Sequence, residues 1–183
     1  MEWMIPGTVL TGKREDVESS IAQIEGMFLG GGIVRSQVAS VTGLESHAVQ
    51  NWVKRGFLSN PVNKRYSCRQ FCRIAIINML KTAMSLEQIC GLLSYVNGRL
   101  DDESDDLIDD TVLYFMFLRL ASQARHIGGN RSWDEVIAEI LQSYDEPVAG
   151  AKERIDKVLR IMLTAWIGVR TIQQAHDMIH QLS

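Results

Sequence analysis

The stretch from Arg35 to Val96 constrains the fold more than any other part of the chain, because it carries a regular series of helix start and stop signals. Gly43 and Gly56 suit the ends of two short helices, since glycine readily adopts the positive φ that a tight corner or a helix C-terminus requires. Two capping boxes follow, Ser67 with Gln70 and Ser85 with Gln88. The pattern predicts two short helices joined by a turn, and then two longer helices.

The second short helix, residues 46–55, separates apolar from polar side chains. Ser46 is predicted to cap it, and Val49, Trp52 and Val53 recur at helical spacing, so we expect them to face the core. The polar side chains then face outward: His47, Gln50, Asn51, Lys54 and Arg55. A short helix, a glycine turn and an amphipathic helix are typical of a helix–turn–helix.

A small β-hairpin is predicted directly after this unit. Two short extended pieces, Phe57–Ser59 and Lys64–Tyr66, flank the sequence Asn60-Pro61-Val62-Asn63. Asparagine and proline favour turns, so the two pieces are expected to pair with each other as a wing. No strand is predicted elsewhere in the chain.

The N-terminal part is predicted to contain one helix followed by a hinge. Lys13–Phe28 has apolar residues at helical spacing, and Gly30-Gly31-Gly32 follows it. Three consecutive glycines are costly in a helix, which is why we expect a hinge there. The helix before the hinge either packs on its own body or forms an arm that packs on another subunit.

Three further helical segments are predicted to complete the chain: residues 107–127, a segment that begins with the capping pair Ser132 and Glu135, and residues 152–182 with an interruption near Gly168. The first is apolar on nearly every side between Val112 and Ala121, so it should be enclosed completely, and Gly128-Gly129-Asn130 ends it.

These segments predict a mainly all-α fold, which consists of a winged helix–turn–helix with a small β-hairpin wing and a C-terminal helical domain. Three parts are expected: an N-terminal helical arm and glycine linker at 1–32, the winged helix at 33–98, and an acidic linker with the C-terminal helical domain at 99–183. The last part would serve dimerisation or effector binding.

Charge is distributed unevenly along the chain. The segment from Arg35 to Lys81 contains eight basic residues and one acid, Glu45, and therefore carries 8 − 1 = +7. The whole chain is −3, which leaves −10 for the rest. The basic residues are Arg35, Lys54, Arg55, Lys64, Arg65, Arg69, Arg73 and Lys81. A localised basic face on an acidic protein indicates a nucleic-acid partner.

The run from Asp101 to Asp110 contains seven acids. It lacks the alternating ligands and central glycine of a calcium loop, so we expect no metal there. Two interpretations stay open. The run is either a solvated linker whose last acids favour a helix N-terminus, or a mimic of nucleic acid that folds back on the basic face.

A helix–turn–helix lays its second helix in the major groove of DNA, where polar side chains reach base edges. Basic side chains of a wing and polar groups at helix starts contact phosphates. The candidates for base contacts are His47, Gln50, Asn51 and Lys54, and those for phosphate contacts are Arg35, Ser36, Arg55, Asn63, Lys64, Arg65 and Arg69. The recognition helix is thus 46–55 and the wing 57–66.

This stretch resembles the winged helix of MerR-type transcription regulators. The resemblance covers roughly a third of the chain and runs through Val38-Ala39, Thr42-Gly43-Leu44, Val49, Gly56-Phe57-Leu58, Arg65-Tyr66-Ser67, Phe71, Ile74, Ile77–Leu80 and Ser85–Ile89. It implies that Arg65 and Tyr66 are the wing arginine and the aromatic residue that lie near phosphates in that family.

The chain departs from the MerR pattern in two ways. Its second helix has Gln50-Asn51-Trp52-Val53 where typical members have Arg-Tyr-Tyr-Glu, which is similar to the variant of excisionase-like relatives. About 30 residues precede the match and a helical domain of about 80 follows, in place of one long coiled-coil helix. The chain looks most like the uncharacterised helical MerR-like families, and the resemblance supports DNA binding better than promoter twisting.

Cysteines and histidines suggest no catalytic or cofactor site. Cys68 and Cys72 are four residues apart on one helix, with Cys90 on the next, and are either packed thiols or a thiol sensor. His176 and His180 lack a third ligand and are expected on the surface. We see no phosphate loop, nucleophile elbow or catalytic triad, and therefore predict that the protein is not an enzyme and needs no cofactor or metal.

We expect a cytoplasmic protein, because no signal peptide or membrane-spanning run is visible and three unpaired cysteines suit a reducing compartment. The first hypothesis is a homodimeric transcriptional regulator that binds double-stranded DNA, with room for a small-molecule effector in the C-terminal domain. The second is a protein–protein interaction module on a winged-helix scaffold, whose basic face meets an acidic partner.

Overall fold

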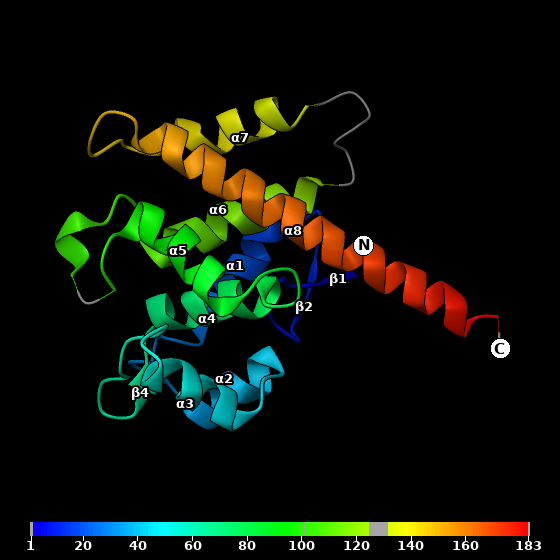
Figure 1. Ribbon diagram of the computed structural model, residues 1–183, viewed down its shortest axis with the longest axis horizontal. Coiled ribbons are helices and arrows are strands. Elements are labelled where there is room, and N and C mark those ends of the chain that lie inside the picture. Colours follow the sequence, from blue (N-terminus) through cyan, green and yellow to red (C-terminus); the bar gives the residue numbers. More distant parts are fainter. Residues whose placement is uncertain (1, 101, 125–131, 183) are drawn as a thin grey trace.

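The computed structural model describes residues 2–100, 102–124 and 132–182. The described part is mainly helical and contains two small two-stranded sheets (Figure 1). The helices are α1 (Val17–Gly26), α2 (Arg35–Thr42), α3 (Ser46–Lys54), α4 (Cys68–Leu80), α5 (Leu86–Asn97), α6 (Asp110–Gln123), α7 (Trp133–Gln142) and α8 (Ala151–His180), with a short 3₁₀ helix at Glu103–Asp105. The strands are β1 (Glu2–Met4), β2 (Thr11–Lys13), β3 (Ile33–Val34) and β4 (Arg65–Tyr66).

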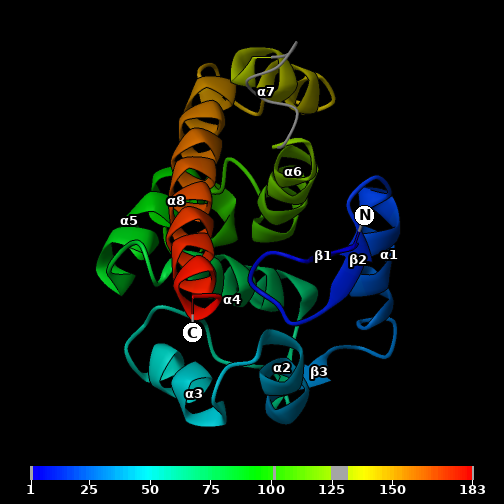
Figure 2. The same ribbon diagram turned by 90° about the vertical axis from the view of Figure 1, so that its right-hand side faces the viewer.

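Helices α4 and α6 form the centre of one continuous core. Every residue from Phe71 to Ile77 of α4 is buried, as is every residue from Leu113 to Leu118 of α6. The two helices pack on each other, and α1, α7 and α8 cover the other sides of α6 (Figure 2). The predicted enclosure of α6 is confirmed except at Val112, which is 43% exposed, and at Arg119, whose side chain is 39% exposed. The chain's own helices supply that enclosure, so α6 gives no reason to expect a second subunit.

The N-terminal residues are part of this core. β1 and β2 form an antiparallel hairpin, with Trp3 opposite Gly12. The prediction of no strand outside the wing was therefore wrong, because strands of three residues are too short to show an alternating pattern. Trp3 and Ile5 are buried, and the hydroxyl of Tyr114 in α6 donates a hydrogen bond to the carbonyl of Pro6 at 2.6 Å.

Helix α1 packs on its own body, which settles one of the two alternatives for the predicted arm. Ile21 and Ile24 are buried, and Glu18 accepts hydrogen bonds from Arg119 of α6 at 2.7 and 2.9 Å. The helix begins at Val17 because the side chain of Asp16 caps it. The glycines that follow lead directly into β3.

The wing differs from the predicted hairpin. β4 pairs with β3, with Ile33 opposite Tyr66 and Val34 opposite Arg65, and does not pair with residues 57–59. Gly32 has a φ of 103°, and a Cβ there would lie 2.8 Å from the carbonyl oxygen of Tyr66. The glycine linker is therefore required for the approach of β3 to β4, and it is not a free hinge.

Most of the predicted helix ends are confirmed. Gly43 adopts the left-handed conformation after α2, and the capping boxes of α4, α5 and α7 are all formed. The residue before α3 is Glu45, without a side-chain cap, so Ser46 is the first residue of that helix. α8 continues without interruption through Gly168. The helix predicted at 107–127 spans Asp110–Gln123 in the structure, and the predicted break at 128–130 lies outside the described residues.

No helix in the described part of the chain is both long enough and apolar enough to cross a membrane.

Candidate nucleic-acid interface

Helices α2 and α3 form a corner that is fixed to the core. Val38 of α2 is fully buried and accepts a hydrogen bond from the Thr42 hydroxyl at 2.7 Å. The side-chain amide of Asn78 in α4 donates to the carbonyls of Thr42, at 2.9 Å, and Gly7, at 3.0 Å. Asn78 thus ties the end of α2 to both the central helix and the N-terminal segment, which holds the corner in place.

Helix α3 presents its polar face to solvent, as predicted. Val49 and Trp52 are buried, so Trp52 is a core residue. The five polar residues predicted to face outward are all exposed: His47, Gln50, Asn51, Lys54 and Arg55. Arg35 and Ser36 at the start of α2 are also exposed. Neither Arg35 nor Lys54 forms an ion pair with any residue that the structure describes.

A tight turn replaces the expected wing corner. Arg65 donates its backbone N–H to the carbonyl of Val62 at 2.9 Å, and Asn63 and Lys64 between them have positive φ values of 49° and 62°. Two consecutive positive φ values are the pattern of a type I′ turn. The turn therefore lies at residues 62–65, later than predicted, and it exposes Asn63 and Lys64 at its tip.

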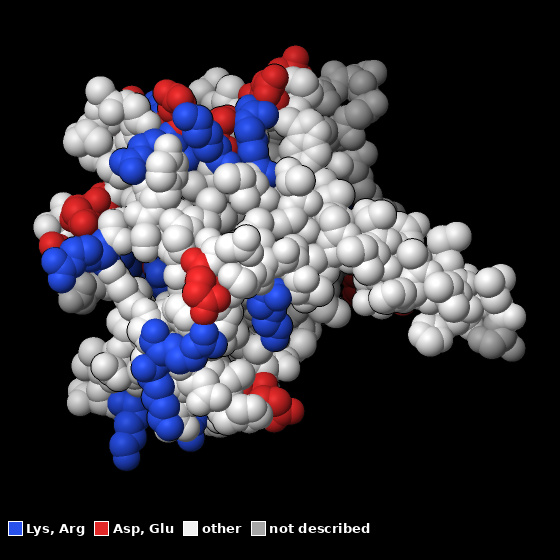
Figure 3. Space-filling view, viewed as in Figure 1, with Lys and Arg blue, Asp and Glu red and all other residues white. Residues whose placement is uncertain are grey.

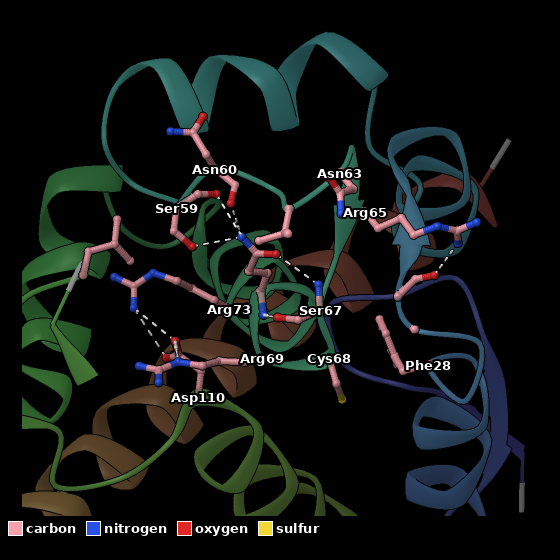
Figure 4. Close-up of a pocket in the computed structure, with 15 residues that line it drawn as sticks. Phe28, Ser59, Asn60, Asn63, Arg65, Ser67, Cys68, Arg69, Arg73 and Asp110 are labelled. Atoms are coloured by element: carbon pink, nitrogen blue, oxygen red, sulfur yellow. Dashed lines mark hydrogen bonds and ion pairs between the residues drawn. The ribbon is translucent and has the colours of Figure 1, made fainter. Parts of the chain in front are cut away.

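Gln70 of α4 holds the loop that leads to this turn (Figure 4). Its amide nitrogen donates to the carbonyl of Ser59 at 3.1 Å, to the Ser59 hydroxyl at 2.9 Å and to the carbonyl of Asn60 at 3.0 Å. Its amide oxygen accepts from the N–H of Ser67 at 3.0 Å to close the capping box. The sequence predicted the capping box alone, because the bonds from Gln70 to residues 59 and 60 depend on the folded loop.

Arg65 and Tyr66, the pair that the MerR resemblance assigns to phosphates, differ in accessibility. Arg65 is exposed and donates one hydrogen bond, to the carbonyl of Gly32 at 2.8 Å. Tyr66 is only 3% exposed, and burial raises the pKa of its hydroxyl. The prediction that Tyr66 contacts DNA is corrected accordingly, because Tyr66 belongs to the buried core and β4 packs against β3, α2 and α4.

Arg69 is not part of the open basic face either. It is ion-paired with Asp106, and its Nε lies 3.4 Å from Asp109 and 3.8 Å from Asp110. Only 22% of its side chain is exposed. The end of the acidic run therefore has features of both interpretations. Asp109 caps α6 and Asp110 lies in its first turn, while Asp106 folds against α4 and occupies the guanidinium group that was assigned to a phosphate.

A buried ion pair lies next to Arg69. Arg73 and Asp110 are 3.3 Å apart, with side chains that are 6% and 2% exposed. Asn97 donates to Asp110 at 2.6 Å, and the Nε of Arg73 donates to the carbonyl of Phe57 at 3.1 Å. Burial raises the pKa of Asp110, and the two guanidinium groups oppose that rise. Arg73 thus supports the wing loop from inside, and its charge is already paired with Asp110.

Arg55 lies at the edge of the open face. It forms an exposed ion pair of 2.7 Å with Glu87 of α5, and its guanidinium lies 4.6 Å from the centre of the Phe57 ring. Exposed pairs of this kind contribute little free energy, so Glu87 can release Arg55 to a competing anion at small cost.

A cavity of about 550 Å³ opens between the wing turn and α4. Arg65, Arg69 and Arg73 contribute to its wall together with Asp110 and Cys68 (Figure 4). The sulfur atoms of Cys68 and Cys72 lie 4.0 Å apart, and the hydrogen bond from Cys72 lowers the pKa of the Cys68 thiol. Burial raises the pKa of Cys72 and of Cys90. Cys72 is therefore a packed thiol, and Cys68 is the one with more thiolate character.

The surface reflects this separation of charges. Basic side chains gather over α3 and β4 at the lower left of Figure 3, whereas basic and acidic side chains are mixed around α7 and the start of α8. Of the twelve predicted DNA-binding residues, ten are exposed around α2, α3 and the wing turn, and Tyr66 and Arg69 are not. The supports of this face, Gln70, Arg73 and Asn78, were not predicted in that role. Gln70 was predicted only as part of a capping box and Arg73 only as one of the basic residues, and Asn78 shows no signal beyond being a polar residue of a central helix.

Comparisons with known proteins identify the same part of the chain. Residues 33–117 match a family model described as "Domain of unknown function (DUF1836)". The chain is 33% identical over 106 residues to the uncharacterized protein YkrK of Bacillus subtilis (strain 168). This alignment covers 56% of this chain and 43% of YkrK. The match thus spans less than half of that relative, and no solved structure matches the chain significantly. The whole candidate interface, from Arg35 to Arg65, lies within the segment that matches DUF1836.

Proposed function

We propose that this protein is a DNA-binding transcriptional regulator in which α3 lies in the major groove of duplex DNA and the turn at 62–65 contacts phosphates. One observation carries the proposal. The exposed face of α3 is wholly polar, and it adjoins Arg35, Lys54 and Lys64, which no described acid neutralises, on a chain that is acidic as a whole. A basic face with base-reading side chains suits nucleic acid.

The side chains of α3 divide into two chemical roles. The amides of Gln50 and Asn51 can each donate to and accept from adenine in the major groove, and Lys54 can donate to guanine. Arg35, Lys64 and Arg65 lie at the start of α2 and on the wing turn, where positive charge neutralises phosphates without reading sequence. Gln50 and Asn51 are therefore assigned to specificity, Arg35, Lys64 and Arg65 to affinity, and Lys54 to both, because its charge also attracts phosphates.

A winged helix–turn–helix of the MerR type is part of this proposal. The order α2, α3, β4, α4 and α5 supports it, since this is the order of elements in that family's domain. The wing is minimal, because β4 pairs with β3 and only the tip at Asn63 and Lys64 extends from it. We therefore assign phosphate contact in the wing to the tip and to Arg65.

Titration of a fluorescently labelled duplex tests the proposal through its salt dependence. For three neutralised phosphates, affinity should fall roughly fortyfold between about 50 and about 200 mM salt. The double variant Lys54→Gln/Lys64→Gln should weaken binding to every duplex, with Lys13→Gln on β2 as the control for loss of an exposed lysine. Absence of any salt-dependent duplex binding at low ionic strength would overturn the proposal.

An acidic protein partner is the competing function. The ion pair between Arg69 and Asp106 favours this second function, because it shows that a basic residue next to this face already binds a carboxylate. The double variant Gln50→Ala/Asn51→Ala discriminates between the two. Loss of preference among duplex sequences indicates base readout, whereas unchanged DNA binding indicates that α3 serves another partner.

A further inference from the structure

Helix α8 consists of two halves that differ in what covers them. From Ala151 to Trp166, it buries a stripe of side chains against the body, which includes Ile155, Leu159 and Met162. No residue of α8 beyond Trp166 is buried. The helix nevertheless continues to His180 and projects past the body (Figure 1). We call residues 167–182 the projecting segment.

The projecting segment turns its polar side toward its own chain. Arg170, Gln173, Gln174 and Asp177 line, together with Arg14, a cavity of about 500 Å³ against the body. Its large apolar residues are highly exposed: Ile172 at 59%, Ile179 at 61% and Leu182 at 88%. Because the polar side faces the body, the protein's own core cannot cover the apolar side.

The apolar side has the spacing of a helix–helix interface. Apolar residues, both large and small, recur at steps of four and three along it: Ile161, Ala165, Gly168, Ile172, Ala175, Ile179 and Leu182. This heptad spacing is the one at which two helices pack side by side. We propose that this side of α8 binds the same side of a second copy of the chain, with the two helices antiparallel.

The order of large and small residues supports antiparallel pairing of identical helices. A two-fold axis between Gln173 and Gln174 makes three kinds of facing pairs between the copies: Ile172 with Ala175, Ile179 with Gly168, and Leu182 with Ala165. In each of these three pairs a large side chain meets a small one, which favours close packing of the two helices, and Ile161 lies beyond the paired region. Parallel pairing in register would set Gly168 against itself and leave a gap.

Two further properties favour a second copy over an unlike partner. The apolar side contains no Lys, Arg, Asp or Glu that could select a partner by charge, and the projecting segment is almost entirely white in Figure 3. The segment is also short, with Gly168 and the β-branched Val169, Thr171 and Ile172, and an isolated helix of such length and composition is marginal in water. Packing against a partner helix would stabilise it.

Light scattering after size-exclusion chromatography tests the proposal without DNA, so its outcome is independent of the proposed DNA binding. The full chain should have twice its mass of 20.6 kDa. The double variant Ile172→Glu/Ile179→Glu should be monomeric. The matched control is Gln174→Glu/Gln181→Glu, which adds the same two charges at the same spacing on the polar side, and it should stay dimeric. A monomeric wild type at roughly 100 μM, or a dimeric Ile172→Glu/Ile179→Glu variant, would overturn the proposal.

A second variant tests the antiparallel orientation. In Gly168→Ile/Ala175→Ile, large side chains face large ones in antiparallel pairs, so dimer affinity should fall by tenfold or more. The substitution at Gly168 is compatible with the folded protomer, because a Cβ there meets no atom within 4 Å, and it favours helix. Tighter dimerisation of this variant would indicate parallel helices and overturn the assigned pairing.

Discussion

Basic residues of the two neighbouring regions, α4 and the α2–α3–wing surface, have opposite environments. On α4, Arg69 and Arg73 are held by Asp106, Asp109 and Asp110. On α2, α3 and the wing turn, the basic side chains are exposed, and none of Arg35, Lys54 and Lys64 is paired with an acid in the described part of the chain. A count of charges along the sequence treats the two sets alike, yet one set supports the fold and the other is free to bind.

The difference arises because α4 is central and α3 is peripheral. A guanidinium that is buried without a carboxylate is costly, so each arginine on the inner side of α4 requires an acid from elsewhere in the chain. The acidic run supplies it. An exposed lysine needs no such partner because water solvates it. The four predictions that follow test this division, from the largest expected effect to the smallest.

The largest effect is expected when the buried pair is broken. Asp110→Ala should lower the free energy of unfolding by about 3–5 kcal/mol, because Arg73 would stay buried without a counter-charge. Chemical denaturation followed by circular dichroism measures it, with Asp145→Ala as the control for loss of an exposed aspartate. The double variant Arg73→Ala/Asp110→Ala should cost less than the sum of the single variants. A loss below about 1 kcal/mol for Asp110→Ala would contradict a structural role for the pair.

The second-largest effect is expected when the hydrogen bonds from Gln70 to the loop at Ser59 and Asn60 are removed. Gln70→Ala should cost about 1–2 kcal/mol, because both the capping box and the bonds to Ser59 and Asn60 are lost. Gln88→Ala is the matched control, since Gln88 closes the equivalent box of α5 and its side chain bonds to no loop in the described part of the chain. The difference in the free energy of unfolding between the two variants, in the same denaturation experiment, measures what the bonds from Gln70 to the loop contribute. Equal losses would mean that the loop does not depend on Gln70.

The third prediction concerns Lys64, whose substitution should change DNA binding and not the stability of the fold. Lys64→Gln is expected to change the free energy of unfolding by less than about 0.5 kcal/mol, because the side chain lies exposed at the tip of the turn. The slope of log affinity against log salt for duplex DNA should fall by about one. Denaturation and anisotropy titrations of one preparation measure both quantities. A marked loss of stability would show that Lys64 supports the fold, as Arg69 and Arg73 do.

The smallest effect is expected at Arg55, which lies at the edge of the exposed basic face and is paired with Glu87. Glu87→Gln releases Arg55 from an exposed ion pair, so the melting temperature should not change measurably. Duplex binding should strengthen slightly at low salt, since one more cation becomes available and one acid is removed. Thermal denaturation and the same DNA titration test it. Weaker DNA binding would show that Glu87 positions Arg55 for its partner.

The parts of the fold that the sequence predicted correctly depend on local interactions. Gly43 ends α2 because of its own φ, and Ser67 and Ser85 start helices through residues three positions away. The outward face of α3 follows from spacing within nine residues. Signals of this range are fully contained in the sequence, which explains why helix order and the polar face of α3 could be predicted.

The parts that were wrong or unforeseen depend on contacts between distant segments. β4 could pair with residues 57–59 or with β3, and the choice is made by Gly32 and by Gln70, which holds the loop away. The burial of Tyr66 and the capture of Arg69 by Asp106 likewise join segments more than 30 residues apart. No local pattern distinguishes a free arginine from a captured one, so two of the predicted site residues had to be corrected.

The position of α4 also limits how the segment matched by DUF1836 can be moved between proteins. Asn78 bonds to Gly7 and Thr42, and α4 packs on α6 and α8 as well as on α2. Residues 33–98 taken alone would lose the partners of Ile74, Ile76 and Ile77, all of which are fully buried. The surface formed by α2, α3 and the wing turn therefore cannot be transferred to another protein by moving residues 33–98 alone. Substitution of the exposed residues of α3 within the intact chain is the way to alter the proposed DNA specificity.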